Sequence, residues 1–127
     1  MLTRELYWVA ALCEGRYNRR MTAVEKLERN GIRVDVSRVE QIARRHHVRE
    51  ILVFGSAIRD DIRDDSDVDL LLSFEPEAHA SLFDLMDIEH ELSVAFGRQV
   101  DIVEREALTN PFRRRAILAS TEPLYAA

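Results

Sequence analysis

Three short apolar runs, separated by segments with helical spacing, constrain the fold of this chain more than any other feature. The runs cover residues 50–54, 68–74 and 99–103. Continuous apolar runs of this length are typical of strands buried within a sheet. Residues 81–96 carry apolar side chains at helical spacing and end at Gly97, which is typical of an amphipathic helix with a glycine stop. The pattern predicts an α/β (α+β) architecture, in which a small mixed β-sheet is flanked by helices.

Further helices are predicted on either side of these runs. A capping box formed by Ser37 and Glu40 marks the start of one helix. Asn30-Gly31 supplies a left-handed stop for another, and Pro111 suits the first turn of the last. The predicted helices cover residues 2–12, 22–30, 37–47 and 110–119, and residues 124–125 are predicted as an edge strand.

Length and composition limit the class of protein. A chain of 127 residues with 46% hydrophobic content can build one ordinary core. We expect an N-terminal helical extension over residues 1–35 and a single domain over residues 36–127. Cys13 is the only cysteine, so no intramolecular disulfide can form. The apolar stretch at residues 6–13 is far shorter than the ~20 residues of a membrane span. We therefore expect a cytoplasmic protein without membrane contact.

The charge distribution argues against a broad nucleic-acid surface. The net charge is −5, whereas such a surface needs dense positive charge against phosphates. Residues 1–49 hold 11 basic and 6 acidic residues, a balance of +5, and residues 50–127 hold 7 basic and 17 acidic residues, a balance of −10. The first part is therefore the one suited to an acidic partner.

The residues that can carry chemistry gather in residues 55–72. Gly55-Ser56 follows an apolar run and opens a predicted short helix that Ser56 caps, so backbone N–H groups and the hydroxyl can hold phosphate. Asp67 and Asp69 lie two residues apart at the start of a strand and so point to the same face. Paired carboxylates are unfavourable unless a cation neutralises them, and oxygen ligands suit Mg²⁺. Taken alone, each feature is also common in ordinary turns and acidic sheet edges.

The spacing between the two parts joins them into one site. Ten residues, 57–66, separate Gly55-Ser56 from Asp67. This length fits one short helix and a turn that returns the chain beside its start. The phosphate-binding turn at Gly55-Ser56 and the carboxylates of Asp67 and Asp69 would then contact the same substrate.

This combination of G-S, ten residues and D-x-D followed by aliphatic residues resembles the DNA polymerase β-like nucleotidyltransferase superfamily. The closer likeness is to its minimal nucleotidyltransferases, the MNT antitoxin-type proteins commonly encoded beside HEPN-domain partners. The resemblance covers roughly residues 36–125, and its specific part is residues 55–72. It implies the polymerase β-like nucleotidyltransferase fold for the domain at residues 36–127.

The resemblance also implies roles for individual residues. Such proteins bind a nucleoside triphosphate with two Mg²⁺ ions on three carboxylates, which here are Asp67, Asp69 and, from a later strand, Asp101. Without the resemblance, Asp101 would be taken for an exposed strand end. The nucleotide-binding positions implied in the same way are Gly55, Ser56, Arg59 and Ser66.

One departure from the family pattern follows Arg59. The family often has glycine at the next position, where this chain has Asp60. The four aspartates between residues 60 and 65 exceed what the chemistry requires, and we expect them on a solvated helix surface. The path of residues 60–65 is therefore expected to differ from that of the family.

The resemblance implies a function for the whole protein. It predicts transfer of AMP from ATP to a hydroxyl acceptor, a tyrosine of a HEPN toxin, so that the protein acts as the antitoxin of the pair. A second hypothesis is a binding module that neutralises its partner by covering it. The carboxylate cluster favours an enzyme, because a steric blocker has no physical need for it. A third is adenylylation of a small molecule of the aminoglycoside type, which calls for a second substrate-binding domain or a homodimer. Homo-oligomers and hetero-oligomers are both compatible with these hypotheses.

Overall fold

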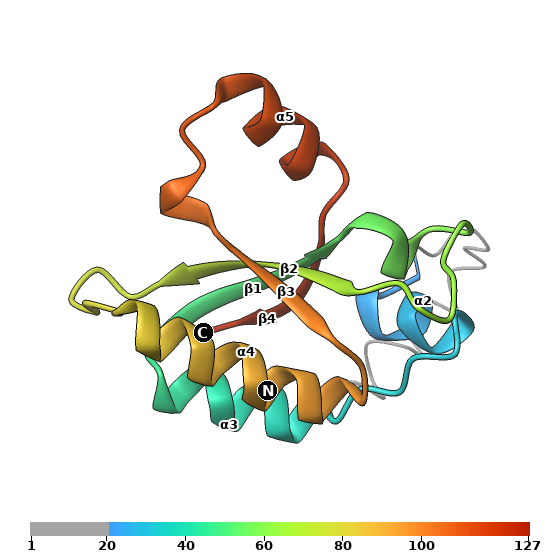
Figure 1. Cartoon of the computed structure of the whole chain (residues 1–127), viewed down its shortest axis with the longest axis horizontal. Helices are drawn as coiled ribbons and strands as arrows, with labels where there is room; N and C mark the ends of the chain where they lie inside the picture. The colour runs from blue at the N-terminus through green and yellow to red at the C-terminus, as the bar shows by residue number, and fades with distance from the viewer. Residues whose placement is uncertain (1–20) are drawn as a thin grey trace, which may run out of the picture.

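A four-stranded mixed sheet organises the computed structural model, which describes residues 21–127 (Figure 1). The fold is therefore α/β, as predicted. The predicted helix at residues 2–12 and Cys13 lie outside the described residues. The elements are α2 (Ala23–Arg29), α3 (Val36–Arg45), β1 (Val48–Phe54), the 3₁₀ turn η1 (Gly55–Ile58), β2 (Val68–Phe74), α4 (Leu82–Phe96), β3 (Val100–Glu104), the 3₁₀ turn η2 (Arg105–Ala107), α5 (Pro111–Ala119) and β4 (Glu122–Ala126).

The order of the strands in the sheet is β3-β2-β1-β4. β2 pairs in parallel with β3, and β1 pairs antiparallel with both β2 and β4. The three apolar runs thus form three adjacent strands, and the predicted edge strand is β4. Parallel β2 and β3 need a crossover, which α4 provides.

One face of the sheet carries the main hydrophobic core. α3 and α4 lie together under this face (Figure 1), and the side chains that point to them come from alternate positions of each strand. On β2 these are Val68, Leu70, Leu72 and Phe74, all buried. Full burial of one such aliphatic side chain contributes about 1.5–3 kcal/mol, so this face supplies most of the stability of the fold.

The opposite face carries a smaller apolar cluster. Leu52, Leu71 and Leu108 are buried there, and Ile117 and Leu118 of α5 pack against them. α5 itself has no fully buried residue, and it stands off the sheet on the side away from α3 and α4 (Figure 1). Fewer apolar side chains are therefore buried on this face than on the first. No helix within residues 21–127 combines the length and apolarity needed to cross a membrane.

Local capping residues fix the helix ends. Gly97 ends α4 with a left-handed backbone at φ +66°, as predicted. The predicted capping box of Ser37 and Glu40 is wrong, because α3 begins earlier, at Val36. The carboxylate of Asp35 accepts a hydrogen bond from the backbone N–H of Arg38 and so takes the N-cap position.

α2 contributes to the same core as the sheet. Leu27 is completely buried and Ala23 nearly so, within the cluster that includes Ala57 and Ile58 of η1. The ammonium of Lys26 forms an ion pair with Glu122 on β4. Whether residues 1–35 behave as a separate extension stays a prediction, but α2 itself packs on the domain.

We expect Leu27→Ala to destabilise the whole protein, because it leaves a cavity where α2 meets η1. A buried leucine truncated to alanine typically costs about 2–5 kcal/mol. Urea denaturation followed by far-UV circular dichroism would measure this loss of stability. Glu28→Ala, on the exposed side of α2, is the matched control and should change stability by less than about 0.5 kcal/mol. Equal, small effects would mean that α2 does not contribute to the core.

Candidate active site

The parallel pairing of β2 and β3 brings two of the predicted aspartates together. Asp69 lies directly opposite Asp101 in the register of the two strands. Asp67 precedes β2 by one residue, on the same end of the sheet. The three predicted carboxylates therefore lie at the same end of two neighbouring strands, although 34 positions separate Asp67 from Asp101 in the sequence.

These carboxylates lie on the face of the sheet away from α3 and α4. Asp69 alternates with Val68 and Leu70, which belong to the main core, and shares its face with Leu71 of the smaller cluster. Asp101 shares that face with Val103. Asp69 is half-buried, whereas Asp67 and Asp101 are exposed. The site is thus open to solvent and a substrate can reach it.

Gly55 is pressed against the carboxylate of Asp69. The antiparallel register pairs Phe54 with Asp69. The backbone therefore leaves the sheet at Gly55, directly beside the side chain of Asp69. Its φ is +77°, in the left-handed region that favours glycine. A Cβ at this position would collide with Oδ2 of Asp69 and lie 3.3 Å from its Cγ. The backbone conformation favours glycine, and a larger residue would also require the carboxylate of Asp69 to move.

The crowding of carboxylates changes the ionisation of Asp69. Burial raises the pKa of the Asp69 carboxyl, and the negative charges of Asp101 and Asp67 raise it further. The positive charge of Arg59 acts in the opposite direction and lowers that pKa. The four side chains therefore form one electrostatic unit with an excess of negative charge.

The donor chemistry of this unit fits Mg²⁺, because every candidate ligand is a carboxylate oxygen. A bound cation would relieve the repulsion that raises the pKa of Asp69. Within residues 21–127, however, no three His, Cys, Asp or Glu side chains are arranged closely enough to hold a metal ion. The fit is one of chemistry and position, and the assignment of the three aspartates as ligands stays a prediction.

Ser56 does not cap a helix as predicted. Residues 55–58 form the single 3₁₀ turn η1, whose N-cap position is Phe54 and has no side-chain cap. The tight turn arises because Gly55 leaves β1 in the left-handed conformation. Ser56 follows it as a half-buried residue whose carbonyl accepts a hydrogen bond from the N–H of Arg59 at 3.0 Å.

The segment from Arg59 to Ser66 is an exposed loop, which corrects the expected helix surface. The guanidinium of Arg59 donates to both carboxylate oxygens of Asp61, at 3.1 and 3.4 Å. This hydrogen bonding lowers the pKa of the Asp61 carboxyl. The acidic residues therefore occupy turns rather than a helix, where aspartate is favoured because its side chain bonds to nearby groups.

Ser66 and Arg98 shape the end of this loop. The hydroxyl oxygen of Ser66 accepts a hydrogen bond from the N–H of Arg63 at 2.9 Å. One nitrogen of Arg98 donates to the carbonyls of Arg63 and Ser66, both at 3.1 Å. Arg98 thus fixes the backbone just before Asp67. Sequence reasoning missed this residue, because a lone arginine after a helix carries no local signal for such a contact.

Comparisons with known proteins agree with this geometry. The model of the nucleotidyltransferase domain family matches residues 36–124. The protein adenylyltransferase MntA of Thermococcus cleftensis is 39% identical over 69 residues, which cover 54% of this chain and 68% of MntA. A solved structure described as a candidate minimal nucleotidyltransferase is 32% identical, with a TM-score of 0.60 over 82% of this chain and 97% of the other.

A third likeness shows the fold alone. It is to a chain of the complex between a tri-AMPylated Shewanella oneidensis HEPN toxin and an MNT antitoxin, with 15% identity, a TM-score of 0.52, and coverage of 72% of this chain and 70% of the other. The family match spans more than half of the sequence, so this chain belongs to the nucleotidyltransferase domain family. Within that family it is a minimal nucleotidyltransferase.

We expect Gly55→Ala to reduce transfer activity about 100-fold, because the new Cβ must displace the carboxylate of Asp69. A shift of about 1 Å at such a group can reduce the rate about 100-fold. Gly97→Ala is the matched control, since Gly97 also has a positive φ but has open space around its Cβ position. Both variants should lose about 1–2 kcal/mol of stability from backbone strain. Steady-state kinetics that show equal activity in the two variants would contradict this role of Gly55.

We expect Asp69→Asn to raise the melting temperature by a few degrees in metal-free buffer at pH 7. The pKa of Asp69 is raised in the folded protein, so its charged form destabilises the fold above the usual carboxyl pKa. For the same reason, the free energy of unfolding of the wild type should fall as the pH rises from the usual aspartate pKa to the raised pKa of Asp69 in the folded protein. Differential scanning calorimetry in EDTA would measure both effects. Asp65→Asn, in the exposed loop, is the control and should leave the melting temperature unchanged; the idea fails if Asp69→Asn melts lower than the wild type.

Proposed function

We propose that this minimal nucleotidyltransferase transfers AMP from ATP to a hydroxyl group of a partner HEPN toxin, with tyrosine as the acceptor residue. One observation carries the proposal. Asp69 lies opposite Asp101 in the sheet, beside a glycine turn in which a Cβ would collide with the Asp69 carboxylate, and the charges of Asp67 and Asp101 both act on Asp69. Burial and the neighbouring negative charges of Asp101 and Asp67 raise the pKa of Asp69, and a bound cation would neutralise this charge.

Each residue of the site would have a separate task. Asp67, Asp69 and Asp101 would hold two Mg²⁺ ions, which supply charge neutralisation and Lewis acidity for phosphoryl transfer. The turn at Gly55 and Ser56 would receive the outer phosphates through its backbone N–H groups. Arg59, whose charge already acts on Asp69, would balance part of the negative charge of the triphosphate.

The chemical step would be an in-line displacement at the α-phosphorus. The acceptor oxygen forms a bond to this phosphorus, and the bond from the α-phosphorus to the bridging oxygen breaks. Pyrophosphate leaves and the acceptor hydroxyl releases its proton. The open position of the carboxylates on the sheet face leaves space for a side chain presented by another protein.

Two kinds of evidence support a protein as the acceptor. MntA of T. cleftensis is named a protein adenylyltransferase, and the MNT antitoxin of S. oneidensis is in complex with an AMPylated HEPN toxin. In addition, α4 exposes four large apolar side chains. Such surface is typical of contact with another protein. The exposed side chains are Leu82, Phe83, Met86 and Val94, with relative exposures of 71%, 77%, 59% and 62%.

The steric-blocker hypothesis predicts the same complex without the chemistry. It does not explain why carboxylates gather around Asp69 beside a left-handed glycine, since covering a partner needs only a complementary surface. Transfer to a small molecule of the aminoglycoside type predicts a labelled small product instead of a labelled protein. The acceptor therefore distinguishes the three hypotheses in one experiment.

We expect radioactivity from ATP labelled at the α-phosphate, but not at the γ-phosphate, to appear on a HEPN-domain protein that binds this protein. The assay uses both purified proteins with Mg²⁺, gel separation and mass spectrometry to locate the modified residue. Asp67→Asn should reduce labelling by more than about 100-fold, because loss of a residue that only supports a metal ligand already costs 10- to 100-fold. EDTA should have the same effect on the wild type.

The controls separate failure of the chemistry from failure of the complex. Asp65→Asn should label the partner at the wild-type rate. A tight complex without label would favour the steric blocker, and full labelling by Asp67→Asn would remove the assignment of this carboxylate. Label on an aminoglycoside and none on protein would support the small-molecule hypothesis.

A further inference from the structure

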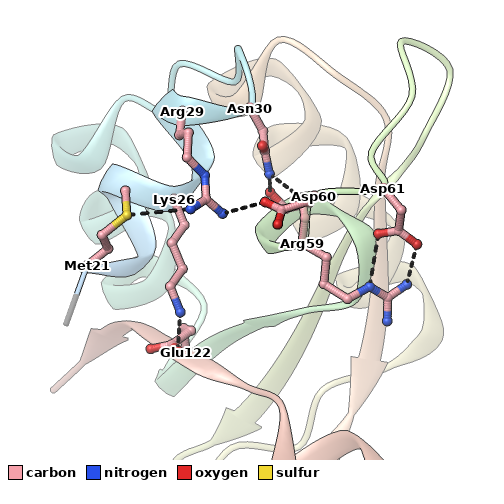
Figure 2. A network of polar contacts seen from close by, with 9 residues as sticks. Met21, Lys26, Arg29, Asn30, Arg59, Asp60, Asp61 and Glu122 are labelled. Carbon is pink, nitrogen blue, oxygen red and sulfur yellow. Dashed lines mark hydrogen bonds and ion pairs between the residues drawn. The ribbon is translucent and has the colours of Figure 1, made fainter.

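α2 lies outside the part of the chain that the nucleotidyltransferase family model matches, yet it contacts the loop next to the active site. The family match begins at residue 36, and α2 ends at Arg29. Figure 2 shows three α2-side residues, Lys26, Arg29 and Asn30, that reach other parts of the domain. Two of them, Arg29 and Asn30, reach the segment that follows η1.

Asn30 makes the most specific of these contacts. Its side-chain amide nitrogen donates hydrogen bonds to the carbonyl of Ala57 at 2.7 Å and to the carbonyl of Arg59 at 2.8 Å. Both acceptors are carbonyl oxygens, so the chemistry itself requires the nitrogen of the amide to face them. Both donors of one amide group are thus used on two peptide units, one before Ile58 and one after Arg59.

The backbone of Asn30 is itself held in place. Asn30 is the C-cap residue of α2, and the N–H groups of Gly31 and Ile32 return to the carbonyls of Glu28 and Leu27, both at 2.9 Å. Leu27 is completely buried in the main core. The amide group therefore projects from a fixed point of the domain rather than from a mobile surface residue.

These two hydrogen bonds act on the turn that carries the phosphate-binding positions. The peptide unit is planar, so holding the carbonyls of Ala57 and Arg59 fixes the orientation of both peptide planes. The peptide units that precede Ile58 and follow Arg59 are thereby held, and together they restrict the direction in which the Arg59 side chain leaves the backbone. Gly55 and Ser56 lie only one turn earlier, in the same 3₁₀ segment.

We propose that Asn30 is a positioning residue for the nucleotide, which holds the turn from Gly55 to Arg59 in the conformation that receives the triphosphate. The inference rests on the proposed function and adds α2 to the active site. Asn30 does not touch the reacting atoms, and it acts through Ala57 and Arg59.

The neighbouring ion pair is consistent with this role but contributes little. A guanidinium nitrogen of Arg29 lies 3.3 Å from Oδ1 of Asp60. Asp60 is the residue at which this chain departs from the glycine common in the family. The side chain of Asp60 is 94% exposed, and ion pairs in that environment are worth little. The ion pair of Arg29 thus joins α2 to Asp60, where the loop differs from the family. The two hydrogen bonds of Asn30 hold α2 to this loop more strongly.

The test compares two shape-conserving substitutions that both weaken the attachment of α2. Asn30→Leu removes both donors without adding charge, and Lys26→Met removes the ion pair with Glu122, which lies on β4 and not on the turn. The measurements are KM for ATP and kcat in the labelling assay, together with the melting temperature and amide hydrogen exchange of residues 55–66.

We expect Asn30→Leu to raise KM for ATP about 5- to 10-fold, as the loss of two ordinary hydrogen bonds allows, with kcat changed less than about twofold. Amide exchange should accelerate within residues 55–66. Lys26→Met should keep KM within about twofold of the wild type even where it lowers the melting temperature. An unchanged KM in Asn30→Leu, or an equal rise in both variants, overturns the proposal.

Failure of the proposed function gives a different result. If the wild type labels no acceptor, ATP binding is measured directly with a fluorescent ATP analogue and Mg²⁺. Weaker binding by Asn30→Leu than by Lys26→Met, with faster exchange confined to residues 55–66, then sustains the positioning role although the transfer reaction is wrong. Equal binding by the two variants, or faster exchange over the whole domain, overturns it.

Discussion

The register between three neighbouring strands is the constraint on which the site depends. β1 pairs Phe54 with Asp69, and β3 pairs Asp101 with the same residue from the other side. A shift of one residue in either pairing would turn the carboxylates toward the main core and expose the aliphatic side chains that now fill it. The register that buries Val68 and Leu70 is therefore the register that assembles the site, and stability and chemistry select the same arrangement.

The two faces of the sheet divide these tasks. α3 and α4 cover one face and provide a dense apolar core, whereas the other face has only a small cluster beneath α5 (Figure 1). Carboxylates could not be placed on the first face without burying charge, which is strongly unfavourable. On the second face, half-burial is enough to couple Asp69 electrostatically to Asp67 and Asp101 while it stays accessible to a substrate.

Two side chains outside the G-S and D-x-D motif hold the loop at residues 59–66, which joins Gly55-Ser56 to Asp67. Asn30 binds carbonyls at the beginning of the loop, and Arg98 binds carbonyls at its end, next to Asp67. Both side chains donate to backbone oxygens, so they restrain the path of the chain without competing for the carboxylates. An exposed loop rich in aspartate would otherwise have few reasons to keep one conformation, since its own ion pairs are solvated.

The sequence by itself determined the strands, the amphipathic helix α4 and the pairing of a glycine turn with two aspartates, because hydrophobic periodicity and motif spacing are local properties. It did not determine where α3 begins, since Asp35 and Ser37 are both good N-caps and only the packed helix selects between them. Other contacts join residues that are far apart in the chain. They are the contact of Gly55 with Asp69, the pairing of Asp69 with Asp101, and the hydrogen bonds from Asn30 and Arg98 to backbone carbonyls. Tertiary structure alone decided these, because strand register and helix docking set which distant atoms meet, and no local pattern encodes that distance.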